Sequence, residues 1–210
     1  MKILSALIIV LLTIQLTRGQ ETAGKDTSNS KIYNTEEQIP EFPGGFQGFG
    51  TYISKNLKYP PVARLLGIAG KVRVSFVVDK TGKVVNIHPD NCMGAGCESE
   101  AVRILEDCPS WKPGIQDGRP VNVQFSVPIS FSLGKGDGKA YMGNLRNSDY
   151  GFVFNIKGKL YTLDEAQKII GDSFLSNDIE IAEPFYNYDK IAKFDMPEKK
   201  EVYLVVMKAG

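Results

Sequence analysis

Residues 121–133 read Val-Asn-Val-Gln-Phe-Ser-Val-Pro-Ile-Ser-Phe-Ser-Leu and decide the fold class of this sequence. Every odd-numbered position in this stretch is apolar, and every even-numbered position is polar or proline. Side chains of a β-strand point alternately to its two faces, so this period predicts a strand with one buried face. Thirteen residues of unbroken alternation predict a strand about 40 Å long, roughly twice the usual length.

The same strand is expected to lie at the edge of its sheet. The strands expected before it are shorter, so part of it should lack a neighbour. Pro128 has no N–H to donate and is therefore typical of an edge or a bulge. The polar face carries no charge, although exposed edges are usually protected by charged side chains. Such an edge can accept a partner's strand; alternatively, the rest of this chain or a second copy covers it.

Working outward from this strand, helical and strand periods predict an α+β domain at residues 39–133. Phe46, Phe49, Ile53 and Leu57 recur at helical spacing and form one apolar face. Valines and one phenylalanine alternate with polar residues in the first expected strand. The expected elements are a helix at 46–57, a short helix at 61–66, strands at 72–78 and 83–88 joined by a turn at 79–82, and a helix at 98–108.

Several short motifs accompany these elements in a fixed order. They are Glu41-Phe-Pro-Gly-Gly45, Lys58-Tyr-Pro60 with Ala63, the hairpin Gly67–Asp79 with Gly82, Trp111-Lys-Pro-Gly114, and the final strand Pro120–Leu133. With these motifs, residues 41–133 resemble the C-terminal domain of TonB, the energy-transducing protein of the Gram-negative periplasm. The resemblance implies helices packed on a three-stranded antiparallel sheet.

The resemblance also implies a partner. In that family the domain binds the N-terminal box peptide of TonB-dependent outer-membrane receptors, which adds as a strand beside the last strand. Carried over to this sequence, the partner-binding residues would be Tyr59, Pro60, Gln124, Phe125, Ser126, Val127, Pro128, Ile129 and Ser130. Another envelope protein could take the receptor's place. A different class of function is also open, namely a homodimeric assembly or structural envelope protein whose long strand pairs with a second copy.

The chain departs from a full transducer of this family. Its only histidine, His88, lies in the expected folded domain rather than in an N-terminal apolar segment. Residues 20–38 are polar and reach only about 60 Å when fully extended, so they are a short linker rather than a long proline-rich spacer. Force transduction by this chain alone is therefore not expected.

The N-terminus predicts export to the periplasm. Residues 3–16 form a short apolar run after Lys2, followed by small or polar residues, as in a secretory signal peptide ending near residue 19. An uncleaved inner-membrane anchor is the alternative. The sequence has 25 Lys and Arg against 24 Asp and Glu, and removal of Lys2 and Arg18 leaves 23 against 24. This neutral balance argues against a nucleic-acid partner.

The cysteines and titratable residues predict no catalysis. Cys92 and Cys97 flank a flexible loop and are a candidate disulfide in an oxidising compartment, whereas Cys108 is expected to be a buried thiol. One histidine and three unevenly spaced cysteines match no zinc pattern. Asp79 and Asp90 suit turn and loop roles. We therefore expect no enzyme activity, no cofactor and no metal.

Residues 134–140 contain three glycines in Gly134-Lys-Gly-Asp-Gly138 and predict a hinge before a second domain at 141–210. Alternation at 152–156, a strand at 160–162, a helix at 163–170 capped by Thr162, and strands at 177–185 and 201–208 predict a small βαββ domain. This part resembles, over a short stretch, the small plug-like modules attached to TonB-system proteins.

Overall fold

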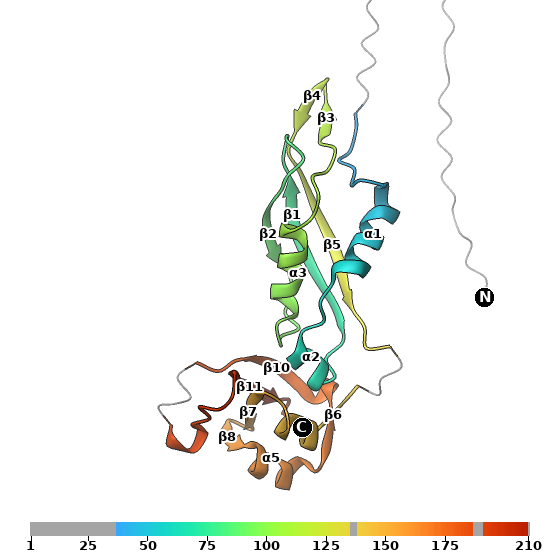
Figure 1. Ribbon diagram of the computed structural model, residues 1–210. Helices are drawn as coiled ribbons and strands as arrows, with labels where there is room; N and C mark the ends of the chain where they lie inside the picture. Colours follow the sequence, from blue (N-terminus) through green and yellow to red (C-terminus); the bar gives the residue numbers. More distant parts are fainter. Residues whose placement is uncertain (1–36, 135–137, 187–190, 210) are drawn as a thin grey trace, which may run out of the picture. The chain divides into compact units, whose positions relative to one another are not determined.

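The computed structural model describes residues 37–134, 138–186 and 191–209. The predicted signal peptide at 1–19, nearly all of the linker at 20–38 and the centre of the hinge lie outside the described residues. Two larger sheets and several short helices confirm the α+β class. The first sheet is antiparallel and has the strand order β2-β1-β5 (Figure 1). Its strands are β1 (Gly70–Val78), β2 (Val84–Pro89) and β5 (Val123–Phe131).

Three helices accompany this sheet: α1 (Gly45–Asn56), α2 (Pro61–Leu65) and α3 (Cys97–Glu106). Val72, Val74, Phe76 and Val78 of β1 are fully buried, as the alternation predicted, and form one core with residues of all three helices. The Tyr52 hydroxyl of α1 donates a hydrogen bond of 3.0 Å to the Ile104 carbonyl of α3. The helices therefore share the buried face of the sheet, and the opposite face of β5 is exposed.

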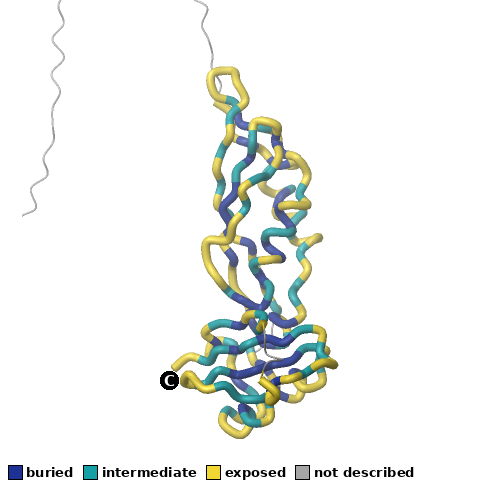
Figure 2. The backbone as a smooth tube through the Cα atoms, turned by 90° about the vertical axis from the view of Figure 1, so that its left-hand side faces the viewer, coloured by how far each residue is buried: buried dark blue, intermediate teal, exposed yellow. Residues whose placement is uncertain are grey.

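Strand β5 is shorter than the sequence predicted. It has 9 residues rather than 13, and every one of them is paired with β1, from Gly70↔Phe131 to Val78↔Val123. The expectation that part of the strand lacks a neighbour along its length is therefore wrong. Asn122 separates β5 from the strand before it, and its side chain accepts a hydrogen bond of 2.9 Å from the Lys80 N–H. Residues before it form the hairpin β3 (Gly114–Gln116) and β4 (Arg119–Val121), whose tip is exposed (Figure 2).

Two side chains differ from their expected burial. Phe46 belongs to the predicted apolar face of α1, yet 88% of it is exposed. It stands in the first turn of the helix, ahead of Phe49, which is the buried residue of α1. Cys108 lies beyond the last residue of α3 and is only partly buried. In α3, the helix ends before the periodicity of its sequence does.

The second larger sheet has the order β10-β11-β7-β8. The elements of this part are β6 (Lys139–Tyr141), α4 (Met142–Arg146), β7 (Tyr150–Ile156), β8 (Lys159–Thr162), α5 (Leu163–Ile170), β9 (Ser173–Leu175), β10 (Ile179–Pro184) and β11 (Glu201–Met207). Thr162 caps α5 as predicted, in a capping box with Glu165. The predicted stretches at 152–156 and 160–162 form β7 and β8 ahead of α5, and β7 runs parallel to β11. Short 3₁₀ turns lie at Ser176–Asp178 and Ala192–Phe194.

All the described residues belong to one compact unit. The Ala95 N–H, in the loop before α3, donates a hydrogen bond of 2.6 Å to the Ala182 carbonyl of β10. Both alanines are part of one continuous cluster of buried residues. The division of this unit into two domains with a hinge at 134–140 stays a prediction.

Candidate functional site

The outer edge of β5 is one of the two edges of the first sheet. β5 is last in the order β2-β1-β5 and has no second strand beside it among the described residues. Its backbone orientation follows from Arg73, which is paired with Pro128. The Arg73 N–H donates to Asn91 Oδ1 at 2.6 Å, and the Arg73 carbonyl accepts from the Asp90 N–H at 2.7 Å. Both backbone groups of Arg73 therefore point away from β5.

Arg73 and Pro128 thus form a non-hydrogen-bonded pair, and pairing alternates along an antiparallel ladder. The even-numbered residues of β5 consequently turn their backbone groups outward. Gln124, Ser126 and Ser130 each offer an N–H and a carbonyl to a further strand, whereas Pro128 offers a carbonyl alone. The odd-numbered residues bond to β1 and turn their side chains inward. Pro128 therefore lies at an edge, where its missing donor costs the sheet no hydrogen bond.

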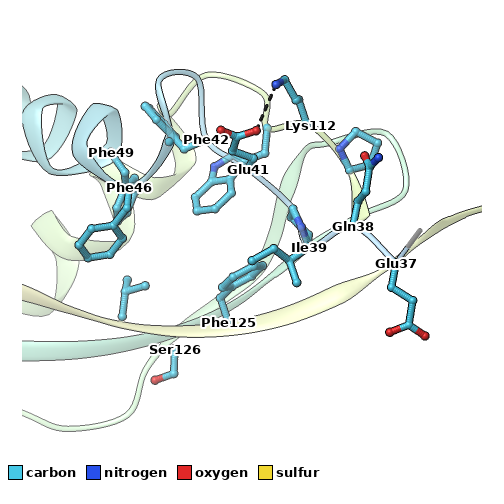
Figure 3. A pocket seen from close by; sticks show the side chains of 15 residues that line it. Glu37, Gln38, Ile39, Glu41, Phe42, Phe46, Phe49, Lys112, Phe125 and Ser126 are labelled. Atoms are coloured by element: carbon cyan, nitrogen blue, oxygen red, sulfur yellow. Dashed lines mark hydrogen bonds and ion pairs between the residues drawn. The ribbon is translucent and has the colours of Figure 1, made fainter. Parts of the chain in front are cut away.

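An apolar groove of about 750 Å³ runs along this edge (Figure 3). α1 lies alongside β5 (Figure 1) and supplies one wall of the groove, while the segment ahead of α1 supplies another. Ile39 and Phe46 are 81% and 88% exposed and turn toward the groove together with Phe125. The lining residues are Glu37, Gln38, Ile39, Pro40, Glu41, Phe42, Gly45, Phe46, Phe49, Trp111, Lys112, Pro113, Phe125, Ser126 and Val127.

Backbone hydrogen bonds hold the wall ahead of α1 in place. Gln38 exchanges hydrogen bonds of 3.0 and 2.8 Å with Ile115, and Glu41 exchanges bonds of 3.1 and 2.8 Å with Lys112. The Lys112 ammonium also pairs with the Glu41 carboxylate at 3.1 Å (Figure 3). The groove is therefore formed before any ligand enters it.

Aromatic side chains form the inner wall. The Trp111 ring has its centroid 5.6 Å from Phe42, 5.4 Å from Phe49 and 5.4 Å from Phe125. Gly82 makes room for this tryptophan, because a Cβ at Gly82 would lie 2.0 Å from the Trp111 carbonyl oxygen. Trp111 is the only tryptophan of the chain, so its fluorescence reports on this groove.

The structure places Tyr59 and Pro60 apart from the groove lining. The Tyr59 ring packs edge-on against Phe131, at the C-terminal end of β5, with centroids 5.7 Å apart. Its hydroxyl donates to the Ile68 carbonyl at 2.5 Å, and burial raises the pKa of Tyr59 to about 12. Pro60 immediately precedes α2. Their contact with a partner stays a prediction, as does that of the β5 residues.

Among the described residues near the sheet, the titratable groups are held in structural hydrogen bonds. The Asp90 carboxylate accepts hydrogen bonds from Ser75 at 2.7 Å and Ser126 at 3.2 Å, and lies 3.5 Å from His88. The Asp90 carboxylate therefore stands between the two serine hydroxyls and the His88 imidazole. Asp79 accepts hydrogen bonds from Thr81 and Lys83 within the β1–β2 turn, as expected for a turn residue.

Cys92, Cys97 and Cys108 are free thiols in the structure. Burial raises the pKa of Cys97 to about 12 and raises the pKa of Cys92 and of Cys108. All three are therefore weak nucleophiles at neutral pH. A Cys92–Cys97 bridge under oxidising conditions stays a prediction.

Sequence reasoning located β5 but missed Ile39 and Phe46. An apolar residue in the first turn of an amphipathic helix gives the same sequence signal whether it is buried or exposed. Glu41-Phe-Pro-Gly-Gly45 was the available sign, because it singled out the segment that forms the groove wall.

One comparison with known proteins identifies this part of the chain. Residues 55–133 match the family model described as Gram-negative bacterial TonB protein C-terminal. No curated protein and no solved structure was found to match the chain. Among the described residues, no helix is both long enough and apolar enough to cross a membrane.

The matched residues contain the three strands of the first sheet together with α2 and α3. Domains of this family mediate protein interactions with outer-membrane receptors rather than catalysis. Residues 55–133 therefore belong to the TonB C-terminal domain family, and this domain indicates a role for the chain in the envelope and in TonB-linked transport.

Proposed function

We propose that the outer edge of β5 binds the N-terminal box peptide of a TonB-dependent outer-membrane receptor by β-strand addition. One observation carries this proposal: a strand edge that has no neighbour in the described part of the chain borders a preformed apolar groove. An exposed edge gives affinity through backbone hydrogen bonds, and pockets for alternate side chains give specificity. The β5 edge supplies the backbone hydrogen bonds, and the groove supplies the pockets for alternate side chains.

The bound peptide would form hydrogen bonds with the outward backbone groups of Gln124, Ser126 and Ser130. Alternate peptide side chains would enter the groove and contact Phe46 and Phe125, which favours apolar residues at those positions. The intervening side chains would lie on the polar face of the sheet. Burial of apolar side chains beside exposed Phe46 would add roughly 25 cal/mol for each Å² removed from water.

The remaining parts of the proposal concern location and chemistry. We propose that the chain reaches the periplasm through a signal peptide cleaved near residue 19, and that it acts there without catalysis, cofactor or metal. N-terminal sequencing of the exported protein tests the cleavage. A mature N-terminus at residue 1 would leave the chain anchored and contradict it.

The test of peptide binding is an NMR titration of the full chain with synthetic receptor box peptides. We expect saturable shifts at the amides of Gln124, Ser126 and Ser130. Trp111 fluorescence should change with the same affinity. Shifts confined to the 138–209 part, or none at all, would overturn the proposal.

Two variants sharpen this test. Val127→Lys places a charge in the groove and should weaken binding at least about tenfold, since a lysine buried without a partner costs more than 1.4 kcal/mol. Phe46→Ser should also weaken binding while leaving the free energy of unfolding within about 0.5 kcal/mol, because Phe46 is exposed. Ser99→Lys, on an exposed position of α3, is the matched charge control.

A homodimer joined through β5 remains the second candidate function. The observation that favours it is that β5 carries no charged side chain. Its edge therefore lacks the usual protection against edge-to-edge pairing. Light scattering distinguishes the two candidates. A stable dimer that Val127→Lys dissociates, with no peptide binding, would favour self-pairing.

A further inference from the structure

Two exposed cations lie on the polar face of the first sheet, one strand away from the β5 edge. Lys71 is paired with Ser130, and Arg73 is paired with Pro128. Residues directly opposite each other in a ladder share a face of the sheet. Both side chains are exposed, and neither has an ion-pair or hydrogen-bond partner among the residues that the structure describes.

The side chains of β5 on this face leave the space above the strand open. Ser126, Pro128 and Ser130 are all small, so none of them extends across the strand to its outer edge. Neighbouring strands lie about 4.8 Å apart, which puts an added strand about 10 Å from β1. The long side chains of Lys71 and Arg73 can therefore reach over β5 toward an added strand, as long side chains do between diagonal neighbours.

The charge of this face changes sign along β5. The Asp90 carboxylate is bonded to Ser126, whereas the two cations lie level with Pro128 and Ser130. Asp90 is in turn occupied by Ser75 and lies beside His88, and no ion pair of Asp90 with Arg73 is recorded among the described residues. An added strand thus meets positive charge at one end of the polar face and negative charge at the middle.

We propose that Lys71 and Arg73 select a strand that carries an aspartate or glutamate on this face, beside Pro128 or Ser130. This inference rests on the proposed strand addition and adds the chemistry of the ligand. The carboxylate would form charge-assisted hydrogen bonds across β5, and the guanidinium of Arg73 can hold it with two parallel bonds. Because Pro128 offers the added strand no N–H, this ion pair also sets the register of that strand.

The test is a double-mutant cycle between protein and peptide. The probes are synthetic twelve-residue peptides in which valine alternates with serine, with one serine replaced by glutamate or by glutamine. Binding to the full chain is followed by Trp111 fluorescence at two salt concentrations. The variants are Arg73→Gln and Lys71→Gln, and the control is Lys159→Gln, an exposed lysine of β8 in the other sheet.

We expect the glutamate peptide to bind the unaltered protein about two- to fivefold more tightly than the glutamine peptide, as for an exposed ion pair. Arg73→Gln or Lys71→Gln should reduce this preference, and higher salt should do the same. Lys159→Gln should leave it intact. A third peptide, with glutamate at a valine position and hence on the groove face, should show no dependence on Arg73 or Lys71.

The two proposals fail in different ways. If none of the peptides binds, strand addition fails and the inference fails with it. If the peptides bind without any preference for glutamate, the inference alone is overturned. The same holds if the preference is equally large in Arg73→Gln, Lys71→Gln and the unaltered protein.

Discussion

Pro128 removes one hydrogen-bond donor from the outer edge of β5, and this single residue limits how well any strand can add there. Alanine at this position would supply an N–H directed outward, next to those of Ser126 and Ser130. We expect Pro128→Ala to tighten binding of a box peptide about two- to tenfold, the equivalent of one hydrogen bond. It should also increase self-association, since the edge loses a protection against pairing. Peptide titration and light scattering measure the two effects.

Ser130→Ala is the matched control for this residue, because it changes the same face of β5 without changing the backbone donors. Unaltered binding and unaltered self-association in Pro128→Ala would show that strands do not add at this edge.

At the scale of elements, α3 is joined to the chain after α1 by the buried carboxylate of Glu100. This group accepts hydrogen bonds from the Lys58 N–H at 2.5 Å and from the Arg103 guanidinium at 2.7 Å. Burial alone would raise the pKa of Glu100, but the hydrogen bonds from Arg103 and Lys58 outweigh it and lower the pKa below 4.5. Glu100→Gln should therefore reduce the free energy of unfolding at pH 7 by about 1–3 kcal/mol.

The sign of the pH dependence follows from the lowered pKa. Stabilisation by Glu100 is fully present above the unfolded-state pKa and is lost as the pH falls through the folded-state value. Urea unfolding at pH 7 and at about pH 3 should show the difference between Glu100→Gln and the unaltered protein shrinking at the lower pH. Glu106→Gln, an exposed position of the same helix, is the control. A difference that stays constant with pH would contradict the role of the carboxylate charge.

At the scale of the whole described unit, Gly94 brings the loop before α3 close to β10. Its φ is +78°, and a Cβ at Gly94 would lie 2.5 Å from the Ala182 carbonyl oxygen. Gly94→Ala should lower the stability by more than the roughly 1–2 kcal/mol expected from left-handed backbone alone. Gly118→Ala supplies the comparison, because its φ is +71° with nothing within 4 Å of the added Cβ. Thermal unfolding followed by Trp111 fluorescence measures both, and equal losses would mean that the contact with Ala182 contributes nothing.

The elements that the sequence predicted correctly are those whose signal is local. Period-two alternation located β1 and β5 because it reports which side chains meet the core. The Thr162 cap located the start of α5 because capping involves only neighbouring residues. Period two continues through Asn122, however, which separates β5 from the strand before it and accepts a hydrogen bond from the Lys80 N–H. A bond between residues 42 positions apart leaves no trace in a local pattern.

The features of the candidate site also divide into those with a local sequence signal and those that depend on packing between distant segments. By itself, the sequence determined that the chain contains a TonB C-terminal domain, that its last strand has one buried and one polar face, and that Pro128 suits an edge. Only the tertiary structure decided that Ile39 and Phe46 stay exposed around a groove, that β5 pairs with β1 along its full length, and that Lys71 and Arg73 stand level with Pro128 and Ser130. The physical reason is that periodicity specifies the face on which a side chain lies, whereas packing between distant segments decides what, if anything, covers that face.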